Sequence, residues 1–148
     1  MSKQMVAGKK IKLYLRLNSN NFLNMKLRLE GNSIRIRVRK SDVEKLKTDG
    51  MIGEAVAFSD SLYFYYKLKT SLHLTEIKAE FLQNVIQVTI PLSMAMDWAN
   101  SETVGLQHTL ESGLNILIEK DFPCKTRENE DKSDVFGELV LKEDPSVC

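Results

Sequence analysis

The sequence predicts a small, mainly β (α+β) domain in which antiparallel hairpins form a curved sheet or a partly open barrel, with one or two short helices. Short segments of alternating apolar and polar residues follow one another between residues 25 and 118, and turn-forming residues separate them. Hydrophobic residues make up 43% of the chain and charged residues 28%, which is typical of a globular fold. At 148 residues, the chain is about one domain long.

The first predicted hairpin joins residues 25–30 to residues 33–39 across Gly31-Asn32, a pair that favours a tight two-residue turn. A helix is predicted directly after this hairpin. Ser41 can accept a hydrogen bond from the first helical turn while Glu44 reaches back to the cap, and Gly50 can end the helix.

Three further hairpins and a second helix are predicted from turn residues and periodicity. The hairpins join residues 55–58 to 62–69, 75–81 to 85–90, and 104–110 to 114–118. The second helix covers residues 93–100 and places Met94 and Trp98 on one side. The expected core consists of Leu27, Leu29, Ile34, Ile36, Phe58, Phe64, Ile86, Val88, Ile116 and Ile118.

The two ends of the chain differ in charge from the middle. Residues 1–24 contain five basic and no acidic residues, whereas residues 119–148 contain nine acidic and five basic ones. We interpret residues 1–24 as a basic extension or extra strand, residues 25–122 as the globular domain, and residues 123–148 as an acidic loop or tail. Residues 1–24 could also be a dispensable extension, such as one from an early start codon, or a targeting peptide.

The acidic end has two further interpretations. Residues 135–141 carry enough apolar side chains to dock on the domain as an added strand or helix. The opposite charges also allow the acidic tail to fold back onto the basic residues of the first hairpin, which would give an autoinhibited site.

The first hairpin carries the most informative charges. A turn at Gly31-Asn32 places Arg28 opposite Arg35 and Lys26 opposite Arg37, and like charges directly across a strand pair are unfavourable. A negative group is therefore expected there. One candidate is an adjacent acidic strand that supplies Glu76 and Glu80, and the other is an anionic ligand held by arginine side chains. The ligand-binding set would be Arg28, Arg35, Arg37 and Arg39.

Catalytic candidates are few. His108 shares the inward phase of its strand, and Cys124 and Asp121 follow the strand paired with it, so a Cys-His nucleophile or a metal site is conceivable. A single inward histidine is more often a hydrogen-bonded core residue, and a single cysteine a small buried hydrophobe. No phosphate loop, dinucleotide fingerprint, nucleophile elbow or paired zinc-ligand spacing is present, so no cofactor and no metal are expected.

The second hairpin places two tyrosines beside two lysines on one side of a strand, a composition that single-stranded nucleic acid could use. The residues are Tyr63, Tyr65, Lys67 and Lys69. The net charge of the chain is only +1 and no RNA-binding signature is present, so nucleic acid is not the expected partner.

Several segments resemble a bacterial family of small proteins described only as a domain of unknown function. The motifs are MKLRLEGNSIR at residues 25–35, KSDVE at 40–44, EKDFPC at 119–124 and EDKSD at 130–134. The resemblance covers about residues 25–134 and implies domain boundaries but no activity. The segment before residue 25 and the segment after residue 134 depart from it.

The sequence favours a non-enzymatic binding module whose cationic strand face accepts an anionic small molecule or an acidic protein segment. The alternatives are a small metal- or thiol-dependent enzyme that uses His108 and Cys124, and a structural protein that pairs through an exposed edge strand. No membrane span or secretory signal is apparent, and the two cysteines imply no disulfide framework, so a cytoplasmic location is expected. The sequence does not determine the oligomeric state.

Overall fold

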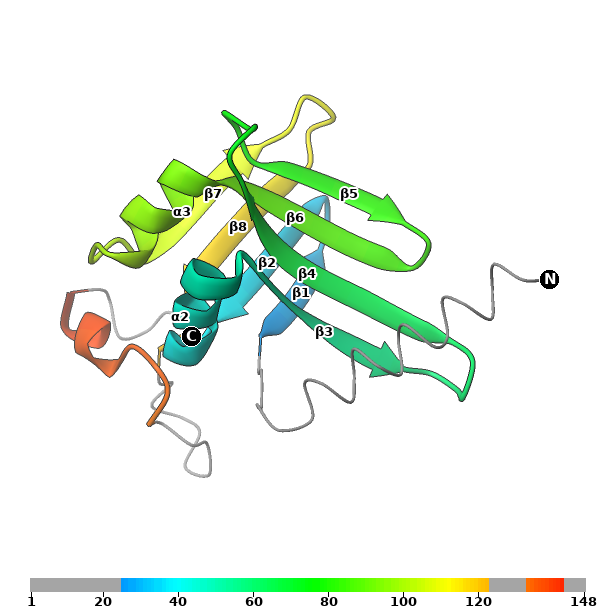
Figure 1. Cartoon of the computed structure of the whole chain (residues 1–148), viewed down its shortest axis with the longest axis horizontal. Helices are drawn as coiled ribbons and strands as arrows, with labels where there is room; N and C mark the ends of the chain where they lie inside the picture. The colour runs from blue at the N-terminus through cyan, green and yellow to red at the C-terminus, as the bar shows by residue number, and fades with distance from the viewer. Residues whose placement is uncertain (1–24, 123–132, 143–148) are drawn as a thin grey trace.

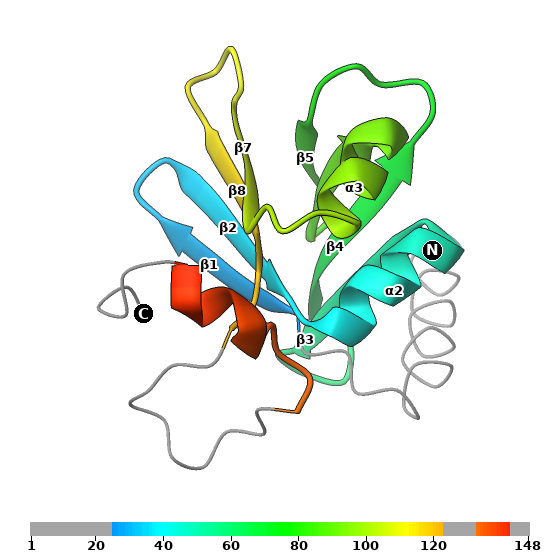
Figure 2. The same ribbon diagram turned by 90° about the vertical axis from the view of Figure 1, so that its left-hand side faces the viewer.

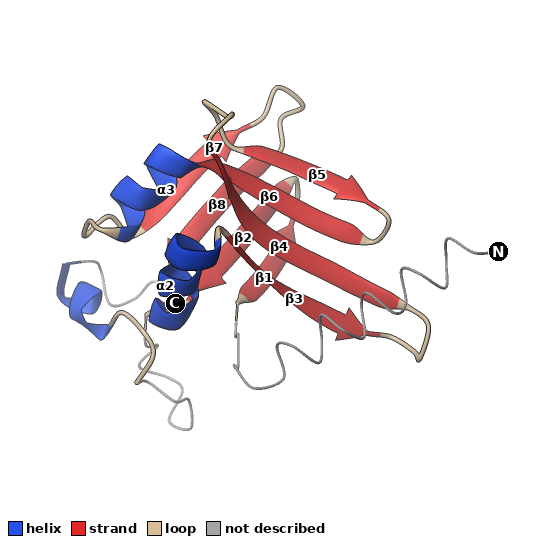
Figure 3. Cartoon of the chain, in the orientation of Figure 1, coloured by secondary structure: helices blue, strands red, loops and turns tan. Residues whose placement is uncertain are grey.

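The computed structural model describes residues 25–122 and 133–142 (Figure 1). Within these ranges, eight strands form two four-stranded sheets, and two α-helices and one short 3-10 helix complete the fold (Figure 3). The predictions for residues 1–24 and for Cys124 lie outside the described residues. No helix in the described part is long and apolar enough to cross a membrane.

Sheet A contains the first and the last hairpins of the domain. β1 (Lys26–Glu30) and β2 (Ser33–Val38) form one antiparallel hairpin, and β7 (Gly105–Thr109) and β8 (Asn115–Lys120) form the other. β2 and β8 lie side by side in parallel, so the strand order is β1-β2-β8-β7.

Sheet B contains the two middle hairpins. They are formed by β3 (Met51–Ala57) with β4 (Tyr63–Ser71) and by β5 (Lys78–Leu82) with β6 (Val85–Pro91). β4 and β6 are parallel neighbours, so the strand order is β3-β4-β6-β5. Figure 2 shows that the two sheets come together on the side of β1 and β3 and diverge toward β7 and β5.

The two halves of the domain have the same topology. Each half is a hairpin, a helix and a second hairpin, with α2 (Lys40–Asp49) in the first half and α3 (Leu92–Ala99) in the second. Each half gives one hairpin to each sheet, and the parallel pair at the centre of each sheet joins the halves. Parallel neighbours cannot be joined by a short turn, which is why a hairpin pattern does not predict them.

Local chemistry explains where α2 begins and ends. The carboxylate of Asp42 accepts a hydrogen bond from the backbone N–H of Arg39 at 2.9 Å and thereby caps the helix start. Gly50 adopts the left-handed conformation with φ of 71° and donates its N–H to the Leu46 carbonyl at 3.0 Å, as predicted for the helix end. The predicted cap at Ser41 is wrong, because its hydroxyl and backbone N–H both donate to the carboxylate of Asp134.

The described C-terminal segment docks on the domain. Val135 and Leu139 are buried, and the backbone N–H of Phe136 donates to the Asp121 carbonyl at 2.8 Å. The segment ends in the 3-10 helix Gly137–Lys142, where Glu138 pairs with Lys40 at 3.1 Å. It therefore lies beside the start of α2, away from the β1–β2 turn (Figures 1 and 2).

The core lies between the inner sides of the two sheets and the two helices. Of the ten predicted core residues, six are buried and two more, Leu27 and Phe64, pack against them partly exposed. Leu29 and Phe58 are 57% and 68% exposed, so their assignment to the core is wrong. Both lie next to hairpin turns. Alternation predicts which side of a sheet a residue occupies, but not whether another layer covers that end of the strand.

The mainly β class with two helices is confirmed, and so are all four predicted hairpins. The sheets do not close into a barrel. Each sheet is mixed because it contains one parallel pair between its two hairpins.

Candidate functional site

The basic residues singled out from the sequence lie on the outer side of β1 and β2. Arg28 faces Arg35 and Lys26 faces Arg37, in the predicted register. The apolar residues that alternate with them point toward the core. We call Lys26, Arg28, Arg35 and Arg37 the cationic face.

The carboxylate that compensates the positive charges of Arg35 and Arg37 comes from β8. Glu119 lies beside Arg37 in the parallel pair, and its Oε2 is 3.1 Å from the Nε of Arg37 and 3.7 Å from the Nε of Arg35. A neighbouring strand does provide an acidic side chain, as expected. The residue is Glu119, and the prediction that Glu76 and Glu80 provide it is wrong. Glu80 lies on β5, an outer strand of the other sheet, and Glu76 precedes that strand.

Two more carboxylates pair with β1. Arg28 contacts Glu30 at 2.8 Å on the same strand, and both side chains are largely exposed. Lys26 contacts the buried carboxylate of Asp121 at 2.8 Å. Among the described residues, the four basic residues of the cationic face contact three carboxylates, and one of these, Glu119, lies near two guanidinium groups.

Arg39 does not share the environment of the other predicted ligand residues. It follows the end of β2 and precedes the first residue of α2. Its Nε atom is buried without a hydrogen-bond partner among the described residues, and its charge lowers the pKa of Asp42. Arg39 therefore acts on the buried carboxylate at the start of α2.

Of the predicted catalytic residues, the structure describes His108 and Asp121. His108 pairs with Ile116 on the inner side of sheet A, which confirms its inward phase. The carboxylate of Asp121 forms a salt bridge with Lys26, and Cys124 lies outside the described residues. Among residues 25–122 and 133–142, no group of three or more His, Cys, Asp or Glu side chains could hold a metal ion.

A group of ionisable residues that the sequence analysis missed surrounds the start of β1. Glu54 on β3 lies opposite Tyr66 on β4, on the inner side of sheet B. Oε1 of Glu54 accepts the backbone N–H of Met25 at 3.3 Å, and the Tyr66 hydroxyl donates to the Met25 carbonyl at 2.8 Å. Fully buried Asp42 completes the group, since its charge helps to raise the pKa of both Glu54 and Tyr66.

Burial dominates the titration of this group. Loss of solvent raises the pKa of Glu54 to about 7 and that of Tyr66 to about 12. Burial also raises the pKa of Asp42, and the nearby charge of Asp134 adds to this effect. A detectable signal was present in the sequence: Glu54 occupies the inward phase of β3, where neighbouring inward residues are apolar.

Lys120 is a second buried ionisable residue that the sequence analysis missed. Its ammonium group donates to the carbonyl of Ser101 at 2.5 Å and lies over the rings of Trp98 and Phe136, 5.7 and 5.4 Å from their centroids. Burial lowers the pKa of Lys120. These contacts attach the C-terminal segment to α3, which is a structural role.

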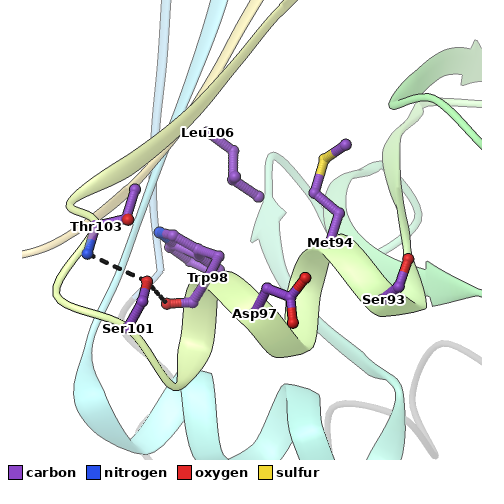
Figure 4. Close-up of a pocket in the computed structure, with 7 residues that line it drawn as sticks. All are labelled: Ser93, Met94, Asp97, Trp98, Ser101, Thr103 and Leu106. Carbon is purple, nitrogen blue, oxygen red and sulfur yellow. Dashed lines mark hydrogen bonds between the residues drawn. The ribbon is translucent and has the colours of Figure 1, made fainter.

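A surface pocket of about 490 Å³ lies along α3 (Figure 4). Its lining residues are Ser93, Met94, Asp97, Trp98, Ser101, Thr103 and Leu106. The polar groups near the loop are already used, because the Ser101 hydroxyl donates to the Trp98 carbonyl and accepts the backbone N–H of Thr103. Asp97 is the one ionisable residue in the lining, so the pocket lacks a set of converging polar groups.

The far end of sheet B exposes several large apolar side chains. Because β4 and β6 are parallel and start together, the β3–β4 and β5–β6 turns lie at the same end of this sheet. The exposed residues there are Val56, Phe58, Leu62, Phe81 and Leu82. Contiguous exposed apolar surface is a feature of interaction sites.

Together these features define a small β-rich domain with two related halves, a cationic outer face and no assembled catalytic centre among the described residues. The chain belongs to a family of unknown function, DUF7009, whose model matches residues 25–138. No curated protein and no solved structure gives a significant match. The resemblance noted in the sequence is thus confirmed, and the family adds no activity.

Proposed function

We propose that the protein is a non-enzymatic binding module whose cationic face holds an anionic ligand, with Arg35 and Arg37 as the main ligand contacts. The observation that supports this proposal is the shared carboxylate of Glu119. Each guanidinium has five N–H donors, and one carboxylate satisfies only a few of the ten. Both guanidinium groups lie on the outer side of β2, so their remaining donors leave capacity for a second anion.

The chemistry of the face favours a phosphate or carboxylate group. Arginine forks bind such groups through two parallel hydrogen bonds, which a lysine cannot reproduce. Arg28 and Arg35 are 59% and 36% exposed, so a ligand can reach them. As part of the same proposal, the protein works in the cytoplasm, where phosphorylated small molecules are abundant and its two cysteines stay reduced.

The test is thermal unfolding at low ionic strength with inorganic pyrophosphate as the probe. A ligand at 100 times its Kd stabilises the native state by about 2.7 kcal/mol, which corresponds to a rise of roughly 5 °C or more for a domain of this size. Arg35→Gln/Arg37→Gln should abolish the rise. Lys67→Gln/Lys69→Gln removes the same charge from the outer side of β4 and is the matched control.

Glu119→Gln provides a second and opposite variant. If Glu119 occupies part of the anion site, removing its charge frees both guanidinium groups and should strengthen pyrophosphate binding several-fold. An unchanged midpoint in the wild-type protein, or an equal rise in the double arginine variant, would contradict the proposal.

The second candidate function is self-association through β5, the outer strand of sheet B. Among the described strands, β5 has a neighbour on one side only, and Phe81 and Leu82 on this strand are 68% and 72% exposed. Antiparallel pairing of β5 with β5 of a second copy would extend the sheet and cover these side chains, and a two-fold dimer is the commonest assembly.

Sedimentation velocity over a range of concentrations tests the dimer. Phe81→Ser/Leu82→Ser should give a monomer at concentrations where the wild-type protein is dimeric. Leu72→Ser changes an equally exposed leucine outside the strands and should leave the dimer intact. A wild-type protein that stays monomeric throughout would exclude this function.

A further inference from the structure

Met25 is held by sheet B although it immediately precedes β1 of sheet A. Its side chain is 3% exposed, its backbone nitrogen donates to the Glu54 carboxylate at 3.3 Å, and its carbonyl accepts the Tyr66 hydroxyl at 2.8 Å. Glu54 and Tyr66 are direct cross-strand partners. The main chain at residue 25 is therefore held in the core by hydrogen bonds to side chains of β3 and β4.

The surroundings of this nitrogen are more negative than a peptide N–H requires. Asp42 is fully buried and uses one carboxylate oxygen for the backbone N–H of Arg39, while its other oxygen has no hydrogen-bond partner in the described ranges. Glu54 faces the same region, and burial together with the charge of Asp42 raises its pKa to about 7. A single neutral N–H offers one proton and no net charge to these two carboxyl groups.

The other charged groups near Asp42 do not remove this excess. Burial, the largest cause, and the charge of Asp134 raise the pKa of Asp42, although the backbone N–H and charge of Arg39 and the charge of Lys45 lower it. Facing Glu54, the described structure contributes the Met25 N–H, Tyr66 and Asp42. A positive charge at the position of the Met25 nitrogen would pair with Glu54, whose surroundings the charge of Asp42 makes more negative.

Two observations on the sequence agree with such a charge. The family match begins at residue 25, so the features shared by the family start at this position. The residue there is methionine, with which translation begins, so initiation at its codon produces the required group without any cleavage step.

We propose that Met25 is the amino terminus of the functional protein and that its α-ammonium group forms a salt bridge with Glu54, in a site completed by Tyr66 and Asp42. The ammonium group occupies the position of the present nitrogen, donates three protons in place of one, and carries the charge that the carboxyl groups lack. The buried side chain of Met25 requires that the methionine be retained.

The first test identifies the natural start. The gene is expressed from its own upstream region with a carboxyl-terminal affinity tag, and the intact mass of the product is measured. The expected mass is that of a chain beginning with Met25. Met25→Leu should remove this product, and Met5→Leu, the control, should leave it unchanged. A dominant product that begins upstream of residue 25 would overturn the proposal.

The second test compares the 148-residue chain with the chain beginning at Met25. Every described strand and helix and the described core cluster lie after residue 24, so the shorter chain contains all of them. At pH 8, Glu54→Gln should lower the thermal midpoint of the shorter chain by several degrees, because the ammonium loses its partner. In the 148-residue chain the same substitution should leave the midpoint unchanged or raise it.

Glu44→Gln is the matched control, because it removes an exposed carboxylate that pairs with Lys47 on the same helix. It should have the same small effect in both chains. In the shorter chain, the α-amine should also titrate about one unit above its usual range of 7.7–8.0, as followed by NMR, and Glu54→Gln should restore that range. Equal effects of Glu54→Gln in both chains, an α-amine of ordinary pKa, or a shorter chain that does not fold would each overturn the proposal.

Discussion

The two sheets have the same strand arrangement but different surface chemistry. Sheet A carries arginines on its outer side, with Glu119 between two of them. Sheet B carries Tyr63 and Tyr65, whose ring centroids are 6.5 Å apart, beside lysines on its outer side, and it ends in exposed apolar side chains. A shared topology therefore does not imply a shared role, and function has to be argued from each face separately.

The largest expected effect tests whether the two sheets contribute equally to stability. Ile118 on β8 and Leu68 on β4 are both fully buried and belong to the central parallel pairs of their sheets. Ile118→Ala and Leu68→Ala should each lower the free energy of unfolding by about 3 kcal/mol, measured by urea denaturation. A loss confined to one variant would show that the two sheets contribute unequally.

The buried carboxyl group of sheet B should make the stability of the 148-residue chain depend on pH. The pKa of Glu54 rises from 4.5 to about 7 on folding, so its contribution is fully present below pH 4.5 and is lost as the pH rises through 7. Allowing for the partial exposure of Glu54, we expect a loss of about 1–2 kcal/mol.

Glu54→Gln should remove this part of the pH dependence, as followed by urea denaturation between pH 4.5 and 8. Glu80→Gln, on the outer strand of the same sheet, is the control. An unchanged pH profile in Glu54→Gln would contradict the assigned pKa.

Lys120 is the corresponding buried charge of sheet A, and its effect has the opposite sign. Its pKa is lowered on folding, so the cost of burying the ammonium falls as the pH rises through the lowered pKa toward 10.5. Lys120→Met keeps the volume and should change stability by no more than about 1 kcal/mol at pH 7. The wild-type protein should become more stable at alkaline pH, and Lys120→Met should not show this increase. Lys45→Met on the surface of α2 is the control.

The smallest expected effect distinguishes the outer sides of the sheets. Glu119→Gln should cost about 0.5–1 kcal/mol at low salt, because Arg35 and Arg37 then repel each other without compensation, and less at high salt. Glu80→Gln on sheet B should be neutral, since it loses only a 3.5 Å contact with Gln87. Equal losses of stability in the two variants would contradict the expected electrostatic difference between the two outer sides.

Local features of the sequence determined much of the fold. The register of the first hairpin followed from Gly31-Asn32, the end of α2 from Gly50, and the inward phase of His108 from strand alternation. Each of these depends on residues close in the sequence, where turn geometry and side-chain periodicity leave few alternatives.

Tertiary structure decided which distant segments meet. Glu119, and not Glu76 or Glu80, forms the ion pairs with Arg35 and Arg37, because β2 pairs with a strand some eighty residues later in the chain. The carboxylate of Asp134 accepts a hydrogen bond from the Ser41 hydroxyl, and that of Glu54 accepts one from the backbone N–H of Met25.

The sequence by itself therefore determined the strands, their turns and the side on which each residue lies. Alternation contains no information on strand order or on how far the opposing layer extends, so only the packing of the two sheets decided the partners of the arginines, the exposure of Leu29 and Phe58, and the acidic surroundings of Met25.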